Sequence, residues 1–246
     1  MTAIPAWPPR STPRLFVETP LAPGPITIDG PQAHYLVGVM RTKVGDPLKL
    51  FDDTTGEWLA IARDVGRRSM TLDVTQHLHP REPVPDLWLC AAPIKKGRID
   101  WMAEKACELG VARFVPVVTR RTIVDKTNTD RLHAHMIEAA EQCGRTALPA
   151  VAEPVKLAAM LRDWPATRAL FFADETGGAP ALAAMRDRPG PAAILIGPEG
   201  GFDDEERGLI RALPAATGIT LGPRILRADT AAAAAVALWM AAAGDW

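Results

Sequence analysis

Hydrophobic and polar positions follow two different patterns along the chain, and the first is typical of a small barrel. Short apolar or alternating runs occur at residues 14–18, 48–51, 58–62 and 69–74. Turn signals rich in Gly, Pro, Asp and Thr separate these runs, which several short strands require. A short helix is expected over residues 31–40. The N-terminal part is therefore predicted to be a β-barrel.

From residue 87 onward, apolar strands alternate with amphipathic helices. The helix after the first of these strands has Ile99, Met102, Ala106 and Leu109 on one face and ends at Gly110. A second helix is expected over residues 130–143. Alternation of this kind predicts an α/β domain with a parallel sheet covered on both faces. Its strands are expected at residues 87–92, 111–118, 168–173, 192–196 and 218–221.

A proline-rich segment separates the two patterns. Residues 77–86 contain Pro80, Pro83 and Pro85, and proline is poorly tolerated inside a strand or a helix. We therefore predict two domains, a barrel over residues 1–77 and an α/β domain over residues 78–246.

Composition fits an ordinary globular protein and excludes several classes. Apolar residues make up 48% of the chain and the net charge is -1, so only a local basic patch is left for binding RNA. The cysteines Cys90, Cys107 and Cys143 lie far apart, which indicates a reducing compartment and argues against disulfides or a zinc site. The apolar run at residues 231–243 is too short to span a bilayer, and residues 1–13 lack a signal peptide's apolar core. We expect a soluble, cytoplasmic protein with no metal and no membrane partner.

Two glycine-containing loops, at residues 194–202 and 221–227, hold most of the functional information. Each follows a predicted strand and leads into a predicted helix, which is how α/β proteins hold nucleotide-like ligands. Neither loop has the pattern of a phosphate-binding loop. The first leads instead into four carboxylates at residues 203–206, where Asp203 and Glu206 are expected to form a capping box. A nucleoside without phosphates, and preferably a cationic one, fits these loops better than a nucleotide.

The charged residues of this domain allow two interpretations at each position. Five basic residues follow predicted strands at the same sheet edge, and they form either a solvated surface or contacts to a phosphate backbone. They are Lys95, Lys96, Arg98, Arg120 and Arg121.

Arg227 and Asp229 flank the second glycine loop, and they also allow two interpretations. They either form a local ion pair with Asp229 capping the last helix, or they place Arg227 at a reacting base. In the second case, Asp229 or Glu199 lies near a proton to be removed. Residues alone thus indicate an α/β ligand-binding enzyme with a barrel appendage and a basic edge.

Four motifs in a fixed order resemble the RsmE family, bacterial methyltransferases of the SPOUT superfamily that act on N3 of a uridine in 16S ribosomal RNA. The resemblance covers nearly the whole chain and includes His34-Tyr35-Leu36 upstream. It implies a PUA-like RNA-binding barrel, an α/β domain with a deep trefoil knot, S-adenosylmethionine as cofactor, and a homodimer. The motifs are Lys105-x-x-Glu108-Leu-Gly110, residues 138–145, residues 195–201 and residues 221–227.

The resemblance also implies roles for individual residues. Arg227 is expected to stabilise negative charge on the uracil oxygens, with Glu199 or Asp229 as orienting group or base. Asp229 stands where the family usually has glutamate, one methylene longer. The cofactor site is expected to be lined by Phe172, Gly197, Glu199, Gly200, Gly201, Leu221, Gly222, Ile225 and Leu226. RNA contacts are expected at Arg14, Arg41, Lys95, Arg121 and Arg145.

These expectations favour an S-adenosylmethionine-dependent methyltransferase acting on 16S ribosomal RNA or the small ribosomal subunit. One alternative is a SPOUT methyltransferase for another ribosomal or transfer RNA position. Another is a non-catalytic RNA-binding assembly factor, which would have no need of intact glycine loops. A dehydrogenase is disfavoured because the chain lacks a dinucleotide fingerprint.

Overall fold

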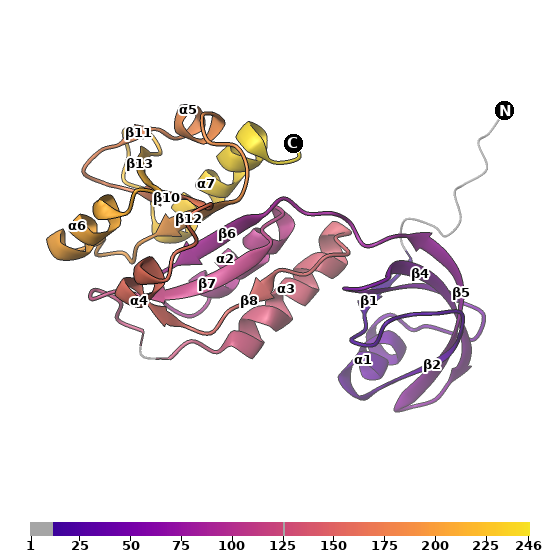
Figure 1. The fold of residues 1–246 in the computed structure, drawn as a ribbon. Helices are drawn as coiled ribbons and strands as arrows, with labels where there is room; N and C mark the ends of the chain where they lie inside the picture. The colour runs from indigo at the N-terminus through magenta and orange to yellow at the C-terminus, as the bar shows by residue number, and fades with distance from the viewer. Residues whose placement is uncertain (1–11, 125) are drawn as a thin grey trace. The chain divides into compact units, whose positions relative to one another are not determined.

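A computed structural model describes residues 12–124 and 126–246, and these fold into two compact units (Figure 1). The first unit extends to Pro83 and also takes in Glu141–Ala147; the second comprises Val84–Ala140 and Leu148–Trp246. The boundary thus differs from the predicted 77/78, because the last barrel strand continues to His79. The segment 141–147 joins the first unit through Glu82, whose backbone N–H donates to Thr146 Oγ1 at 2.9 Å.

The first unit is a curled sheet with strand order β1-β3-β4-β5-β2, in which β1 is parallel to β3 and the other pairs are antiparallel. Leu36, Leu48, Leu50 and Leu72 are among the fully buried residues of its core. The predicted barrel and its four strands are confirmed. Its elements are β1 (Arg14–Phe16), β2 (Gly24–Asp29), α1 (Gly30–His34), η1 (Tyr35–Val39), β3 (Pro47–Asp52), β4 (Gly56–Val65) and β5 (Ser69–His79).

Two features of this unit differ from the prediction. β2 was not expected, because its start coincides with the prolines interpreted as a turn. As an edge strand paired only with β5, it tolerates Pro25 and buries little more than Ile28. The predicted helix over residues 31–40 is present, but its second half, η1, is a π-helical turn.

The second unit is a parallel sheet with strand order β11-β13-β10-β12-β6-β7-β8, and β9 pairs with β7. The five predicted strands of this domain are confirmed, with ends that differ by at most two residues. Its strands are β6 (Leu87–Ala91), β7 (Arg113–Val118), β8 (Ala150–Val151), β9 (Val155–Lys156), β10 (Ala169–Ala173), β11 (Ala179–Pro180), β12 (Ala192–Ile196) and β13 (Ala216–Thr220).

Helices cover both faces of this sheet, as predicted (Figure 1). One face carries α2, α5 and α7, and the other carries α4 and α6, whose Leu161 and Ile210 share a core cluster with Phe172 and Leu195. The helices are α2 (Arg98–Glu108), α3 (Thr129–Cys143), α4 (Leu157–Arg162), α5 (Ala181–Arg186), α6 (Asp204–Ala212) and α7 (Ala228–Ala243). Within the described part of the chain, no helix has the length and apolar character needed to cross a membrane.

Strands β12, β10 and β13 lie side by side, so the loops that follow them meet at one sheet edge. Phe172 of β10 lies in register with Leu195 of β12 and Gly218 of β13. A Cβ at Gly218 would come within 3.2 Å of the Phe172 ring, so the missing side chain lets the strands pack closely. This close packing brings the glycine loops together.

Candidate active site

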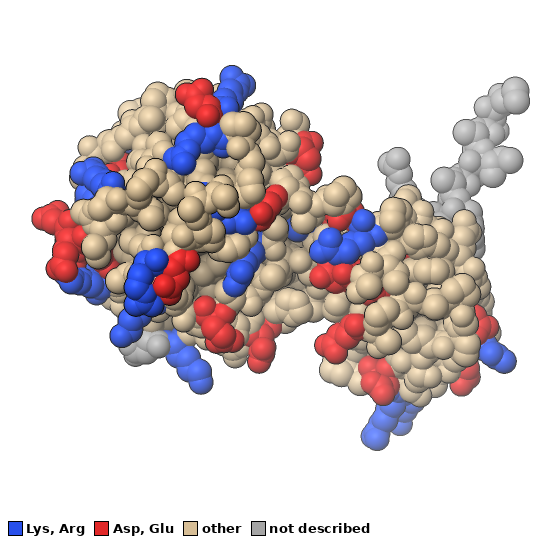
Figure 2. All heavy atoms as spheres, viewed as in Figure 1, with Lys and Arg blue, Asp and Glu red and all other residues tan. Residues whose placement is uncertain are grey.

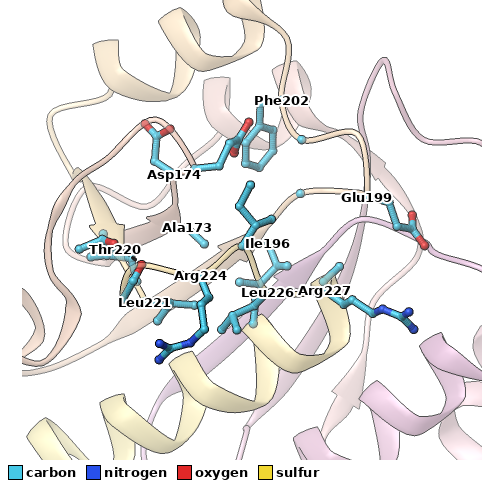
Figure 3. A pocket seen from close by; sticks show the side chains of 18 of the residues that line it. Ala173, Asp174, Ile196, Glu199, Phe202, Thr220, Leu221, Arg224, Leu226 and Arg227 are labelled. Carbon is cyan, nitrogen blue, oxygen red and sulfur yellow. Dashed lines mark hydrogen bonds between the residues drawn. The ribbon is translucent and has the colours of Figure 1, made fainter.

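The loops after β10, β12 and β13 enclose a cavity of about 480 Å³, a size that suits a small organic ligand (Figure 3). The two glycine loops identified from sequence therefore form one site. Eight of the nine predicted cofactor residues line it, together with Arg227. They are Gly197, Glu199, Gly200, Gly201, Leu221, Gly222, Ile225 and Leu226.

The backbone at two positions of the cavity wall favours glycine. Gly201 has a φ of +67°, and a Cβ there would lie 2.4 Å from Oε1 of Glu175. Gly222 has a φ of +104°, which side-chain-bearing residues rarely adopt. The loops consequently present backbone groups to a ligand at close range.

The four carboxylates at residues 203–206 lie at the start of α6 but do not face the cavity. The predicted capping box is confirmed, because Glu206 N–H donates to Asp203 Oδ1 at 2.8 Å and Asp203 N–H to Glu206 Oε2 at 3.2 Å. Arg120 pairs with Asp203 at 3.2 Å and with Glu205 at 2.6 Å. None of residues 203–206 is among the described residues that line the cavity. Its carboxylates are Asp174, Glu175 and Glu199 instead, and its cations are Arg224 and Arg227.

One end of the cavity is built on a buried ion-pair network. Asp174 accepts hydrogen bonds from Arg207 and from Arg211, and its Oδ1 also accepts from Thr176 Oγ1 at 2.8 Å. Arg207 additionally donates to Glu175 Oε1 at 2.8 Å. Burial raises the pKa of Asp174, but the hydrogen bonds from Thr176 and Arg211 and the Arg207 charge outweigh it, so its pKa lies below the ordinary value. This network links the loop after β10 to α6 through charge-balanced ion pairs.

The other end carries the residues expected to perform chemistry. In Figure 3 the Glu199 carboxylate and the Arg227 guanidinium lie on the same side of the cavity, away from Asp174. Arg227 is exposed, and its side chain has no ion pair among the described residues. Arg227 is also the N-cap residue of α7, so the predicted capping of this helix by Asp229 is not what the structure contains.

Two of the predicted catalytic and cofactor-binding residues do not line the cavity. Phe172 is 1% exposed and belongs to the hydrophobic core behind the wall, because the strand continues for one more residue and Ala173 reaches the cavity instead. Asp229 lies in the first turn of α7 and accepts two hydrogen bonds of 3.0 Å from Arg98. It is therefore an ion-pair partner and not an open cavity residue.

The predicted RNA-binding residues separate into two groups. Arg41, Lys95 and Arg121 are exposed. Arg121 also donates to the carbonyl oxygen of Gly200 at 2.6 Å, so it supports the first glycine loop. Arg14 and Arg145 are largely buried instead, since Arg14 pairs with Glu57 at 2.5 Å and donates to the Arg145 carbonyl at 2.7 Å.

Sequence reasoning missed Asp174, although its place directly after a predicted strand was a usable signal. It also left Arg98 as a generic member of the basic edge. Figure 2 shows that basic and acidic side chains alternate over the visible face of the second unit. A single uniform basic patch is not seen there.

Comparison with known proteins places this site in a family. A family described as an RNA methyltransferase domain matches residues 80–240, and an RNA methyltransferase PUA domain matches residues 28–75. Ribosomal RNA small subunit methyltransferase E of Rickettsia conorii is 30% identical over 207 residues, which are 83% of this chain and 84% of that protein. The chain belongs to the RsmE family. The RsmE protein of Synechocystis is 32% identical over 86% of this chain and 71% of its own length.

Solved RsmE-like structures share the whole fold. An RsmE of Neisseria gonorrhoeae bound to S-adenosylmethionine is 25% identical, with a TM-score of 0.87 over 95% of this chain and 99% of that one. A Legionella pneumophila methyltransferase in complex with the same cofactor is 28% identical, with a TM-score of 0.85 over 96% and 99%. The predicted fold class, a SPOUT α/β knot domain after a PUA-like barrel, is confirmed.

Proposed function

We propose that this protein transfers a methyl group from S-adenosylmethionine to N3 of a uridine in 16S ribosomal RNA. The observation that carries the proposal is the joining of three loops into one cavity, with Arg227 and Glu199 at the same end. Family membership supports ribosomal RNA as the substrate. The choice of uracil N3 rests on the family resemblance and on the charge expected to develop at that base.

The residues of the cavity fit S-adenosylmethionine. Glycines at several positions of its lining, among them Gly201 and Gly222, leave the backbone open to close contact with a ligand. The carboxylates Asp174, Glu175 and Glu199 outnumber the two arginines in the described part of the lining, and such a balance suits a sulfonium and an ammonium group. When bound, the cofactor supplies an activated methyl group.

Arg227 and Glu199 act on the RNA base in this proposal. Uracil N3 is a poor nucleophile until its proton leaves, and the resulting negative charge spreads to the flanking oxygens. The exposed Arg227 guanidinium stabilises that charge by hydrogen bonding. Glu199, which is 38% exposed at the side chain, accepts the proton directly or orients a water that does so. Asp229 is 14% exposed and held by Arg98, so we assign the base role to Glu199.

Partners and compartment follow from the same proposal. Arg41, Lys95 and Arg121 are exposed cations available for the RNA backbone. A homodimer is proposed from the family resemblance. A ribosomal RNA substrate supports a cytoplasmic location.

The proposal is tested with small subunits from a strain that lacks this protein. After incubation with S-adenosylmethionine, mass mapping of the digested 16S RNA should find one new 3-methyluridine. Arg227→Ala and Glu199→Gln should lower kcat by about 10²-fold, while Arg162→Met, an exposed α4 change, should not. A methyl group at another base or in transfer RNA would support the alternative methyltransferase. RNA binding without methyl transfer would indicate an assembly factor.

A further inference from the structure

Arg98, at the start of α2, contacts acidic residues from two different segments around the cavity. Its Nε and Nη2 donate to the two carboxylate oxygens of Asp229 at 3.0 Å each. Its Nη1 lies 3.7 Å from Oε1 of Glu199. One guanidinium therefore joins the first glycine loop to the start of α7, which directly follows the second glycine loop.

The geometry of this contact is specific. A bidentate arginine–carboxylate pair fixes both the separation and the orientation of the two groups, whereas a lysine of matching reach keeps only the separation. Asp229 Oδ1 also accepts from the backbone N–H of Thr230 at 2.8 Å. Both oxygens of Asp229 are consequently engaged, whereas the Glu199 carboxylate has, within the described part of the chain, only the longer contact with Arg98.

The backbone of Arg98 is itself held in place. Gly97, with a φ of +86°, donates its N–H to Oδ2 of the buried Asp100 at 2.8 Å. Arg131 of α3 also donates to Oδ2 of Asp100. The start of α2 is thereby anchored on α3, so the guanidinium extends from a fixed point.

We propose that Arg98 is a positioning residue for methyl transfer. By holding Asp229, it sets the start of α7, where Arg227 is the N-cap residue. By facing Glu199, it keeps that carboxylate on the same side of the cavity as Arg227. The two groups assigned to the uracil ring are thus placed by one side chain that does not line the cavity. The inference rests on the proposed function and extends it.

The reach of the pair gives a sharp test. Lysine is shorter than arginine and glutamate is longer than aspartate, so Arg98→Lys with Asp229→Glu approximately restores the summed length. Arg98→Met should lower kcat by about 10²-fold, since small misplacements of reacting groups have effects of that size. The KM for RNA and the Kd for S-adenosylmethionine should change less than about threefold. Arg98→Lys and Asp229→Glu should each be impaired, and the double variant should regain at least about tenfold in kcat over the weaker single one.

Arg162→Met is the matched control, because it removes an arginine paired to an aspartate on the exposed surface of α4. Thermal unfolding of every variant separates misfolding from misplacement. Full kcat in Arg98→Met, or purely additive effects in the double variant, would overturn the inference. Absence of 3-methyluridine with the wild-type enzyme would instead remove the proposed function. If Arg98→Met does not fold, Arg98→Lys, alone and combined with Asp229→Glu, decides the question by the same criterion.

Discussion

The guanidinium of Arg207 donates a hydrogen bond to the buried carboxylate of Asp174, at the end of the cavity away from Glu199 and Arg227 (Figure 3). The Asp174 side chain is 1% exposed and that of Arg207 is 10% exposed. Their interaction is therefore screened little by water. It connects α6 to the loop after β10, which forms part of the cavity wall.

Replacing Asp174 by Asn should destabilise the fold. The change leaves Arg207 buried with only part of its compensation, and loss of one partner of a buried pair costs about 3 kcal/mol. Urea unfolding at neutral pH measures this loss. Asp163→Asn is the control, because it removes an exposed partner of Arg162 and should leave the free energy of unfolding unchanged.

The Asp174 contribution should also depend on pH. Because the pKa of Asp174 is lowered in the folded state, its stabilising effect is complete above the unfolded value of about 4. It is lost as pH falls through the lower folded pKa. The difference in unfolding free energy between wild type and Asp174→Asn should therefore be constant from about pH 5 to 7 and shrink below about pH 4. A difference that stays the same down to about pH 2 would contradict this account.

Gly201→Ala should weaken S-adenosylmethionine binding. The added methyl group would meet Glu175 Oε1 at 2.4 Å, and the φ of +67° is unfavourable for alanine. We expect at least a tenfold increase in Kd by calorimetry, which corresponds to about 1.4 kcal/mol.

Gly208→Ala provides the matched control for that variant. Gly208 lies inside α6, a Cβ added to it would have nothing within 4 Å, and alanine favours helices. Its Kd should be unchanged and its stability equal or higher. Equal S-adenosylmethionine binding by the two alanine variants would show that the loop at Gly201 does not hold the cofactor.

The sequence predicted this site where the information is local. The glycine loops, the capping box of Asp203 and Glu206, and the strands before the loops depend on neighbouring residues, and they were placed correctly. Which charges meet across the fold was not predictable, because Arg98 and Asp229 are 131 residues apart. Without the sheet order, each arginine has many acidic side chains as possible partners.

Burial of charged residues was equally inaccessible from the sequence. Arg14 was predicted as an RNA contact, but its guanidinium lies 3.7 Å from the Phe51 ring centroid and pairs with the buried Glu57. A basic residue before a short strand can either be buried in an ion pair or be exposed to contact RNA. Only the pairing of β1 with β3 decides between them.

Native thiol labelling should distinguish the cysteines. Burial raises the pKa of Cys90 to about 12, and the opposing charges of Arg168 and Arg113 are too weak to offset it. Cys107 is also buried, whereas Cys143 is exposed. At about pH 8 an aromatic disulfide reagent should label one thiol per chain, and Cys143→Ser should abolish this reaction. Labelling of Cys90 in the folded protein would show that β6 opens to solvent.

Arg14 and Arg41 should respond differently to substitution, although both were predicted to contact RNA. Arg14→Ala leaves the buried Glu57 with only Lys49, at 3.8 Å, as an ion-pair partner among residues 12–124 and 126–246, so the barrel should lose about 3 kcal/mol of stability. Thermal or urea unfolding measures this loss. If the stability is unchanged and RNA binding is weakened, Arg14 contacts the RNA directly and this account is wrong.

For Arg41 we expect the opposite result, in which stability is kept and RNA binding is weakened. Its backbone has a φ of +56°, which glycine adopts without strain. Arg41→Gly should therefore be at least as stable as wild type, since relief of a left-handed conformation contributes about 1 kcal/mol. The arginine at this position therefore has a strained backbone, and such strain is typical of functional positions. If the exposed guanidinium binds a phosphate, the variant should weaken RNA binding and reduce the slope of log K against log salt by about 0.7 to 0.9. Arg162→Ala should leave that slope unchanged, and an unchanged slope in Arg41→Gly would exclude the phosphate contact.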